Sequence, residues 1–178
     1  MFFFKKLIIF LAMSWFPLMV NSSQICKSDN TLATTPTNQF IDNGNGTVTD
    51  KKSSLMWKKC SEGQSGNDCS ENSAVTYNWK EALEEIYRIN SNEGFAGYKD
   101  WRLPNIKELH SIIEKQCQSP AINLEVFPSE SIELSGGFWS SSPNTWGAIW
   151  MAWFGGKGYV DFQQKPYSYN VRLVRGGK

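Results

Sequence analysis

The stretch "GYKDWRLPNIKELHSII", Gly97–Ile113, constrains the fold of this 178-residue chain more than any other. Asn105 stands where a helix N-cap is expected, and Glu108 follows three residues later, which is the spacing of a capping box. Apolar residues recur behind them at helical spacing and form one stripe: Ile106, Leu109, Ile112 and Ile113. The pattern predicts a helix that starts just after Pro104. His110 lies beside the stripe and is interpreted as a surface or partly buried side chain.

The same design occurs upstream, in "NWKEALEEIYRINSN". Asn78 is the expected N-cap and Glu81 occupies the third helical position. One apolar face is expected from Trp79, Leu83, Ile86 and Ile89. Asn92 and Gly94 supply the stop signal. The chain therefore has two predicted helices.

The stretch "FIDNGNGTVTD", Phe40–Asp50, has two interpretations, a calcium loop or a tight turn. A calcium loop needs oxygen ligands at its first, third and fifth positions. Counted from Asp42, the third and fifth positions are Gly44 and Gly46, which have no side-chain oxygen. Asn and Gly tolerate the positive φ of hairpin turns, so the stretch predicts a β-hairpin. Calcium remains possible in principle but is not indicated, and no metal or other cofactor is expected.

The other segments complete an α+β pattern. Residues 24–38 are polar and predict an extended arm, and residues 119–144, rich in Pro and Gly, predict a long irregular loop region. The last third contains short strand-like runs, "AIWMAWF", "GYVDF" and "YNVRLVR". Between the first two, "GGKG" is expected to be a turn, because it lacks the sequence context of a phosphate-binding loop.

The N-terminus has the order of a secretory signal peptide. Lys5 and Lys6 precede an apolar run over residues 7–20, and Ser22 and Ser23 follow it. The alternative is a retained membrane anchor, but the run falls short of the ~20 residues that a span needs, and Pro17 interrupts it. We therefore predict a signal peptide over residues 1–23, an arm over 24–38 and one domain over 39–178. The protein is expected in the periplasm, at the cell surface or in the medium.

Charge and cysteine content limit the class of protein further. Removal of residues 1–23 changes the formal charge from +1 to −1, because it removes two lysines and no acid. A near-neutral chain has no general field for nucleic acid, so none is expected as a partner. Export favours disulfides among the four cysteines, and four cysteines allow three pairings. Cys60 and Cys69 flank a polar loop, which favours Cys60–Cys69 with Cys26–Cys117; a zinc site is the rival interpretation.

Several motifs together carry a resemblance to a known family. The segments "FIDNGNGTVTDKKSSLMWKKC", "GYKDWRLPNIKELHSII", "FWSSSP" and "YNVRLVRGGK" resemble the C-terminal domain family of the Legionella collagen-like protein. The resemblance covers residues 39–178. It implies a loop-rich C-type-lectin-like α+β fold, in which N- and C-terminal strands pair and two helices pack on small antiparallel sheets. It also implies binding of sulfated glycosaminoglycans, as in a surface adhesin.

A related enzyme family shares part of this pattern. "WRLPNIKEL" resembles a segment of the formylglycine-generating, or sulfatase-modifying, enzymes, which hold copper with cysteines near the C-terminal end. This chain has no cysteine after Cys117, so those catalytic residues cannot be transferred. We interpret the shared segment as structural, with Arg102 paired inside the fold. No other catalytic arrangement is recognisable, and the chain is not expected to be an enzyme.

Aromatic and basic residues supply the candidate binding site. Trp57, Trp79, Trp101 and Trp139 are expected in the core, whereas Trp146 follows "SSSPNT" and is the candidate for a ligand surface. We predict that the ligand-binding residues are Ser141, Asn144, Trp146 and Lys157. A wider basic set could serve a sulfated polysaccharide: Lys51, Lys52, Lys58, Lys59, Lys157, Lys165, Arg172 and Arg175.

The leading hypothesis is an exported, non-enzymatic recognition domain in adhesion. Its ligand would be a surface polysaccharide or a protein of the envelope or host surface, bound through the loops of residues 119–146. The alternative is a structural or assembly component of the bacterial cell envelope. An oxidase-like or hydrolytic enzyme is the third hypothesis. The sequence predicts neither an oligomeric state nor a membrane span after signal removal.

Overall fold

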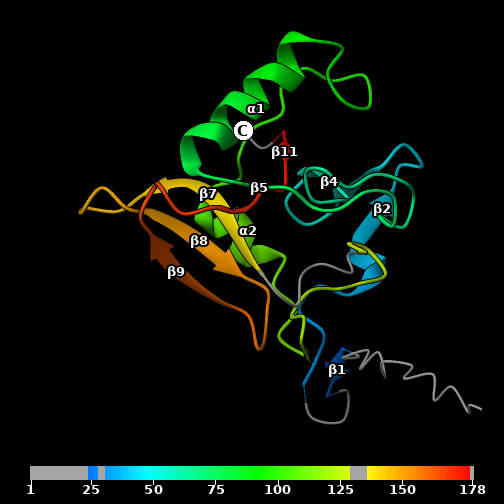
Figure 1. The fold of residues 1–178 in the computed structure, drawn as a ribbon. Helices are drawn as coiled ribbons and strands as arrows, with labels where there is room; N and C mark the ends of the chain where they lie inside the picture. Colours follow the sequence, from blue (N-terminus) through cyan, green and yellow to red (C-terminus); the bar gives the residue numbers. More distant parts are fainter. Residues whose placement is uncertain (1–23, 28–30, 129–135, 177–178) are drawn as a thin grey trace, which may run out of the picture.

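The structure is a computed structural model that describes residues 24–27, 31–128 and 136–176, so the predicted signal peptide lies outside the described residues. The helical elements are η1 (Thr37–Gln39), α1 (Trp79–Ser91) and α2 (Ile106–Ser111). The strands are β1 (Ile25–Cys26), β2 (Phe40–Asp42), β3 (Thr47–Asp50), β4 (Met56–Lys58), β5 (Thr76–Tyr77), β6 (Cys117–Gln118), β7 (Gly137–Pro143), β8 (Ile149–Trp153), β9 (Tyr159–Gln163), β10 (Tyr169–Asn170) and β11 (Val174–Arg175). The predicted mixed α+β class is confirmed (Figure 1).

The largest sheet has the strand order β5-β10-β7-β8-β9. β10 runs parallel to β7, and the other neighbours are antiparallel. Successive residues of a strand face opposite sides of a sheet, so Phe138 packs with the apolar residues of α2, whereas Trp139 packs with those of α1. The two helices therefore cover opposite faces of this sheet, and each encloses its own apolar core (Figure 1).

A four-stranded sheet joins the two ends of the domain. Its order is β11-β4-β3-β2, and Val174 of β11 lies opposite Trp57 of β4. This pairing of N- and C-terminal strands is the one that the family resemblance implied. Trp57, fully buried, packs in the same core as α2, so the sheet and that helix are stabilised together.

The β2–β3 hairpin confirms the turn prediction. Gly44 and Gly46 have φ values of +71° and +81°, which side chains other than glycine rarely adopt. Asp42 Oδ1 accepts a hydrogen bond from the Gly44 N–H at 2.9 Å, and its Oδ2 lies 2.8 Å from Lys59 Nζ. The hydrogen bond from Lys59 and the one from Gly44 lower the pKa of Asp42. Both carboxylate oxygens thus stabilise the turn.

Both predicted capping boxes are present. The Asn78 and Asn105 side chains accept from the third helical N–H, and the Glu81 and Glu108 side chains accept in return from the N-cap N–H. The buried face of α1 differs from the prediction. α1 buries Ala82 and Ile86 and leaves Leu83 partly exposed, because the small Ala82 side chain lies against the sheet.

α2 is also shorter than its apolar stripe suggested. It ends at Ser111, and Ile112 and Ile113 remain buried in the turn that follows. Their burial depends on the core around Phe138 and Phe154, not on continuation of the helix. Apolar spacing therefore predicted the buried residues correctly and the helix end incorrectly.

The prediction of an irregular region over residues 119–144 is wrong at its C-terminal end. Residues 137–143, "GFWSSSP", form β7, which lies inside the large sheet between β10 and β8. The strand has an irregularity between Trp139 and Pro143 in its pairing with β8. There the Ser140 hydroxyl donates to the Trp150 carbonyl and accepts from the Ser142 N–H. Three serines and a proline made this segment resemble a loop in sequence. It forms a strand because β8 and β10, from other parts of the chain, pair with it.

The N-terminal arm is attached to the body by covalent and polar contacts. β1 pairs with β6, and the predicted disulfides Cys26–Cys117 and Cys60–Cys69 are both present. Further along the arm, the buried carboxylate of Glu114 accepts the N–H and hydroxyl groups of Thr34 and Thr35 at 2.8–3.3 Å. It also accepts the Gln116 N–H at 2.8 Å. One carboxylate thus holds the arm against the turn that follows α2.

This carboxylate predicts a pH dependence of stability. Burial alone raises the pKa of Glu114, but the hydrogen bonds from Gln116, Thr34 and Thr35 outweigh it and lower the pKa. A lowered pKa in the folded state stabilises the fold above the ordinary carboxyl pKa of about 4.3, and this contribution is lost as the pH falls through the folded-state pKa. Glu114→Gln is therefore expected to lower the free energy of unfolding at pH 7 by about 1–3 kcal/mol.

The difference should shrink as the pH falls below the ordinary carboxyl pKa, because the wild-type carboxylate then becomes protonated as well. Urea unfolding at pH 7 and at acidic pH measures it. Glu84→Gln, an exposed carboxylate on α1 paired with Lys80, is the matched control and should change stability little at either pH. A Glu114→Gln defect of equal size at both pH values would contradict the prediction.

Candidate functional site

Trp146 lies at the tip of the β7–β8 connection, in a turn built by Asn144. The Asn144 side-chain oxygen accepts from the N–H groups of Trp146 and Ala148 at 2.9 and 3.0 Å, and the backbone N–H of Asn144 donates to the Ala148 carbonyl. Gly147 supplies the positive φ of +80° that closes the turn. The Trp146 side chain is 75% exposed. Trp57, Trp101 and Trp139 are buried as predicted, and Trp79 is partly buried.

The exposed indole packs on Phe162, which in turn packs on Trp150. Trp146 and Phe162 have centroids 5.6 Å apart, and Phe162 lies at the same distance from Trp150. Phe162 of β9 pairs directly with Trp150 of β8, so both rings project from the same face of the sheet. We call Trp146, Trp150 and Phe162 the aromatic triad. Trp150 and Phe162 are partly buried, so the triad presents chiefly the exposed indole of Trp146.

The other predicted site residues are not all near the triad. Asn144 shares its turn, but Ser141 lines a separate groove of about 490 Å³ beside Leu83, Arg102 and Glu108. Lys157 lies in the β8–β9 turn, at the opposite end of β8 from Trp146. A five-residue strand is roughly 17 Å long. The four predicted residues therefore belong to three places on the surface.

Lys157 has two basic neighbours that the sequence did not reveal. Lys27, Lys115 and Lys157 line one concavity of about 190 Å³ beside the Cys26–Cys117 disulfide. Within the described ranges these three side chains form no ion pair with an acid. We call them the lysine pocket. The disulfide and the β1–β6 pairing bring Lys27 to Lys115, a proximity that no local signal in the sequence predicted.

The wider basic set does not form a surface patch. Lys58 and Lys59 are buried and paired at 2.8 Å with Glu62 and Asp42 respectively. Arg175 is paired with Asp100 at 2.7 Å, and Lys165 lies over the ring of Trp79. The expectation that these residues serve an anionic ligand together is wrong, because Lys58, Lys59 and Arg175 pair with acids of the fold and Lys165 packs on Trp79. Of the N-terminal members of the set, Lys51 and Lys52 stay exposed.

Arg172 shows most clearly how the structure differs from that expectation. It is fully buried, and its guanidinium carbon lies 5.0 and 5.4 Å from the ring centroids of Phe127 and Phe138. Its Nη1 donates to the carbonyls of Lys58 and Lys59. Burial lowers the pKa of Arg172 to about 9, and the charge of Glu62 opposes this effect. Arg172 therefore belongs to the interior and is not available to a ligand.

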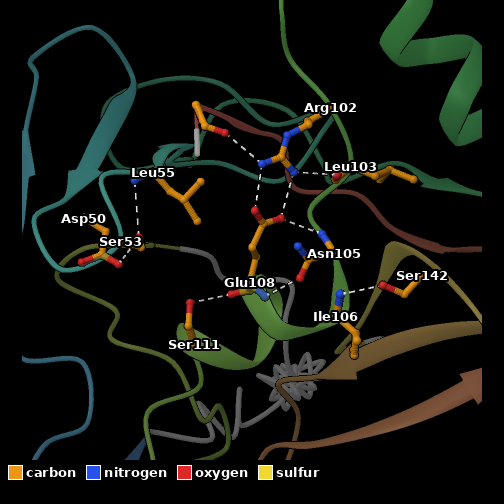
Figure 2. A network of polar contacts seen from close by, with 11 residues as sticks. Asp50, Ser53, Leu55, Arg102, Leu103, Asn105, Ile106, Glu108, Ser111 and Ser142 are labelled. Atoms are coloured by element: carbon orange, nitrogen blue, oxygen red, sulfur yellow. Dashed lines mark hydrogen bonds and ion pairs between the residues drawn. The ribbon is translucent and has the colours of Figure 1, made fainter. Parts of the chain in front are cut away.

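The segment shared with the enzyme family has a structural role around Arg102. Figure 2 shows its guanidinium paired with both oxygens of Glu108, at 2.8 Å each. Glu108 also accepts the Asn105 N–H, and the Ser142 hydroxyl accepts the Ile106 N–H, which connects α2 to β7. Arg102 Nη2 reaches the Gly176 carbonyl as well. The motifs "WRLPN" and "FWSSSP" thus meet to fix the start of α2. The predicted pairing of Arg102 is present, but its side chain is 39% exposed and does not lie in the core.

Across residues 24–27, 31–128 and 136–176, no group of three or more His, Cys, Asp or Glu side chains is placed to hold a metal ion. His110 is exposed on α2, in agreement with its interpretation as a surface histidine. In the same ranges, no helix combines the length and apolar character needed to cross a membrane. The triad presents a flat apolar ring, and the lysine pocket presents hydrated positive charge.

Comparison with known proteins identifies the family but gives no individual relative. A search of curated proteins returns no match to this chain. The family described as the Lcl C-terminal domain matches residues 46–175, which is well over half of the chain and contains both helices and the aromatic triad. The two disulfides of this chain are typical of domains that fold in an oxidising compartment. The chain belongs to the Lcl C-terminal domain family.

Proposed function

We propose that the protein is an exported, non-enzymatic recognition domain that binds a surface polysaccharide in adhesion. The observation that carries the proposal is the exposed indole of Trp146, held in place by Phe162 and by the Asn144 turn. A rigid aromatic side chain contributes a large contact area and loses little conformational entropy on binding. A sugar ring has an apolar face that can pack on such a surface, while its hydroxyls remain in water.

Export is supported by two independent features. Residues 1–23 have the order of a signal peptide, and we propose that they are removed. The two disulfides support a final location in the periplasm, at the cell surface or outside the cell, since such bonds persist in oxidising compartments.

The lysine pocket supports an acidic polysaccharide as the ligand. Its three ammonium groups lie together without an acidic partner among the described residues, so they raise the local concentration of anionic groups. Sulfate esters and uronic acids are the anionic groups of surface polysaccharides, and sulfated glycosaminoglycans are the class implied by the resemblance. A chain of several sugars is long enough to reach from the triad to Lys157.

A glycan array tests the proposal, using the oxidised chain without residues 1–23, in calcium and in chelator. We expect selective binding to sulfated or uronic-acid glycans in both buffers. Trp146→Ala is expected to weaken the affinity for the best glycan by roughly 10–30-fold, as for a central aromatic contact. Tyr87→Ala is the matched control, because Tyr87 is equally exposed (76%) but lies on α1.

Equal losses in the two variants would contradict a site at the triad. A blank array in both buffers would contradict polysaccharide recognition itself. Crosslinking in the native envelope would then test the protein-partner alternative.

A further inference from the structure

Another cavity, distinct from the lysine pocket and from the groove at Ser141, lies on the other side of the molecule from the triad. It has a volume of about 300 Å³ and opens between the β2–β3 turn and the loop closed by the Cys60–Cys69 disulfide. Its lining includes Asn45, Lys58, Ser65, Asn67 and Phe95. In Figure 1, β2 and β4 lie at the right and the β7–β8 turn at the far left, so the cavity and the triad are well separated. Its size is that of the smallest ligand pockets in proteins.

The walls of this cavity are held rigidly. On one side, Gly46 packs on Phe95 so closely that an added Cβ would lie 3.0 Å from the Phe95 Cζ, and the Gly46 carbonyl accepts the Lys59 N–H. On the other side, the disulfide loop is crossed by paired backbone hydrogen bonds between Ser65 and Glu71. The buried Gln64 amide donates to the Cys69 carbonyl at 3.1 Å. A pocket fixed in this way loses little freedom when a ligand enters.

The floor carries a buried ammonium group and an aromatic ring. Lys58 is only 8% exposed, and its Nζ lies 2.8 Å from Glu62 Oε1 and 4.6 Å from the centroid of Phe95. An ammonium has three donors, and Glu62 takes one of them. Because Lys58 is already paired with Glu62, the floor offers directed hydrogen bonds and an apolar ring without an unpaired charge. This combination favours a neutral ligand over an anion, since a buried anion would lack a free counter-charge.

The rim adds amide groups that the fold leaves available. The Asn45 side-chain oxygen accepts from the Thr47 hydroxyl at 2.6 Å, and in the part of the chain that the structure describes its NH₂ group has no partner. Asn67 is exposed, and its amide makes no hydrogen bond to any described residue. Side-chain amides both donate and accept, which matches the hydroxyl groups of a sugar.

We propose that this cavity binds one uncharged sugar residue, with the apolar face of the ring on Phe95 and its hydroxyls paired with Asn45, Lys58 and Asn67. The site goes beyond the polysaccharide recognition proposed above, and it does not require the triad or the lysine pocket to bind anything. Three features on different segments, the β2–β3 turn, β4 and the disulfide loop, create it together.

Protein-detected NMR titration of the oxidised chain without residues 1–23 tests the site. The probes are free D-glucose, D-galactose, D-mannose and N-acetyl-D-glucosamine, with inorganic sulfate as the anionic comparison. At least one sugar is expected to give saturable shifts of the Asn45 and Asn67 side-chain amide signals, in the millimolar range expected for so small a ligand. Sulfate is expected to leave these signals unchanged.

Asn67→Ala is the main variant, because this exposed amide supports no described part of the fold. It is expected to weaken sugar binding about tenfold, and Phe95→Leu is expected to abolish it while the amide spectrum remains that of a folded protein. Trp146→Ala should bind the sugar as well as the wild type does, which separates this site from the polysaccharide surface. Absence of saturable shifts with all four sugars would overturn the proposal, as would unchanged affinity in Asn67→Ala or saturation of the same signals by sulfate.

Discussion

Replacement of Cys26 and Cys117 by serine is expected to lower the free energy of unfolding by about 4–5 kcal/mol, the largest effect predicted for this domain. The bond closes a loop of 91 residues, and in the chain-entropy model a cross-link restricts the unfolded chain more strongly when the loop is longer. In the folded state it joins β1 to β6, so after its removal the arm is held only by non-covalent contacts, among them the β1–β6 pairing and Glu114. Urea unfolding of the two oxidised proteins measures the difference.

The second disulfide provides the comparison. Cys60 and Cys69 are 9 residues apart, so the same model gives roughly 2–3 kcal/mol for the Cys60→Ser, Cys69→Ser double variant. The two losses should therefore differ by about 2 kcal/mol. Equal losses would show that loop length does not determine the stabilisation here. Loss of the longer cross-link should also separate Lys27 from Lys115 and Lys157, and so weaken binding of an acidic glycan without affecting Trp146.

Replacement of Trp139 by alanine is expected to lower the free energy of unfolding by about 3–5 kcal/mol, as for other buried large aromatic residues. Trp139 is fully buried on the α1 face of the large sheet, where it packs edge-to-face on Tyr169 at 5.1 Å. Its indole N–H donates to the Tyr77 carbonyl at 2.7 Å, which links β7 to β5. The variant loses this hydrogen bond and leaves a cavity between the helix and the sheet.

Trp146→Ala is the natural control, because it makes the same chemical change seven positions away in the same hairpin. With its side chain 75% exposed, it should change stability by no more than about 0.5 kcal/mol. Thermal or urea unfolding of the two variants, side by side, separates a core role from a surface role. A large stability loss in Trp146→Ala would mean that the triad is part of the core, and a loss of glycan binding in that variant could then not be assigned to a contact.

The interactions that the sequence predicted are mostly short-range. A capping box involves residues three positions apart, so Asn78 with Glu81 and Asn105 with Glu108 could be recognised directly. The Asn–Gly pattern of the β2–β3 turn depends on local φ preferences, so the hairpin turn could be predicted from these residues alone. The choice of disulfide pairs was also correct, because the short polar segment between Cys60 and Cys69 can fold back on itself.

Burial and sheet pairing could not be predicted in the same way. The serine-rich β7 is a strand because β8 and β10 pair with it, and β10 comes from more than twenty residues further along the chain. Lys58, Lys59 and Arg172 look like surface cations in the sequence, yet they are buried. Groups distant in the chain meet each of them there: the Phe95 ring meets Lys58, the Asp42 carboxylate meets Lys59, and the Phe127 ring meets Arg172. The cost of burying a charge depends on its partners, and partners are set by tertiary contacts.

The sequence by itself thus determined the family, the α+β class, the two helix starts, the hairpin turn and the disulfide pairs, and it singled out Trp146 among the tryptophans. Only the tertiary structure decided that Trp146 is exposed and packs on Phe162, and that Ser141 and Lys157 lie apart from it. It alone brought Lys27 to Lys115 and formed the cavity beside Phe95. The physical reason is the range of the interactions: caps and turns depend on neighbours within a few positions, whereas surfaces are made by strand pairing, core packing and a disulfide that join residues far apart in the chain.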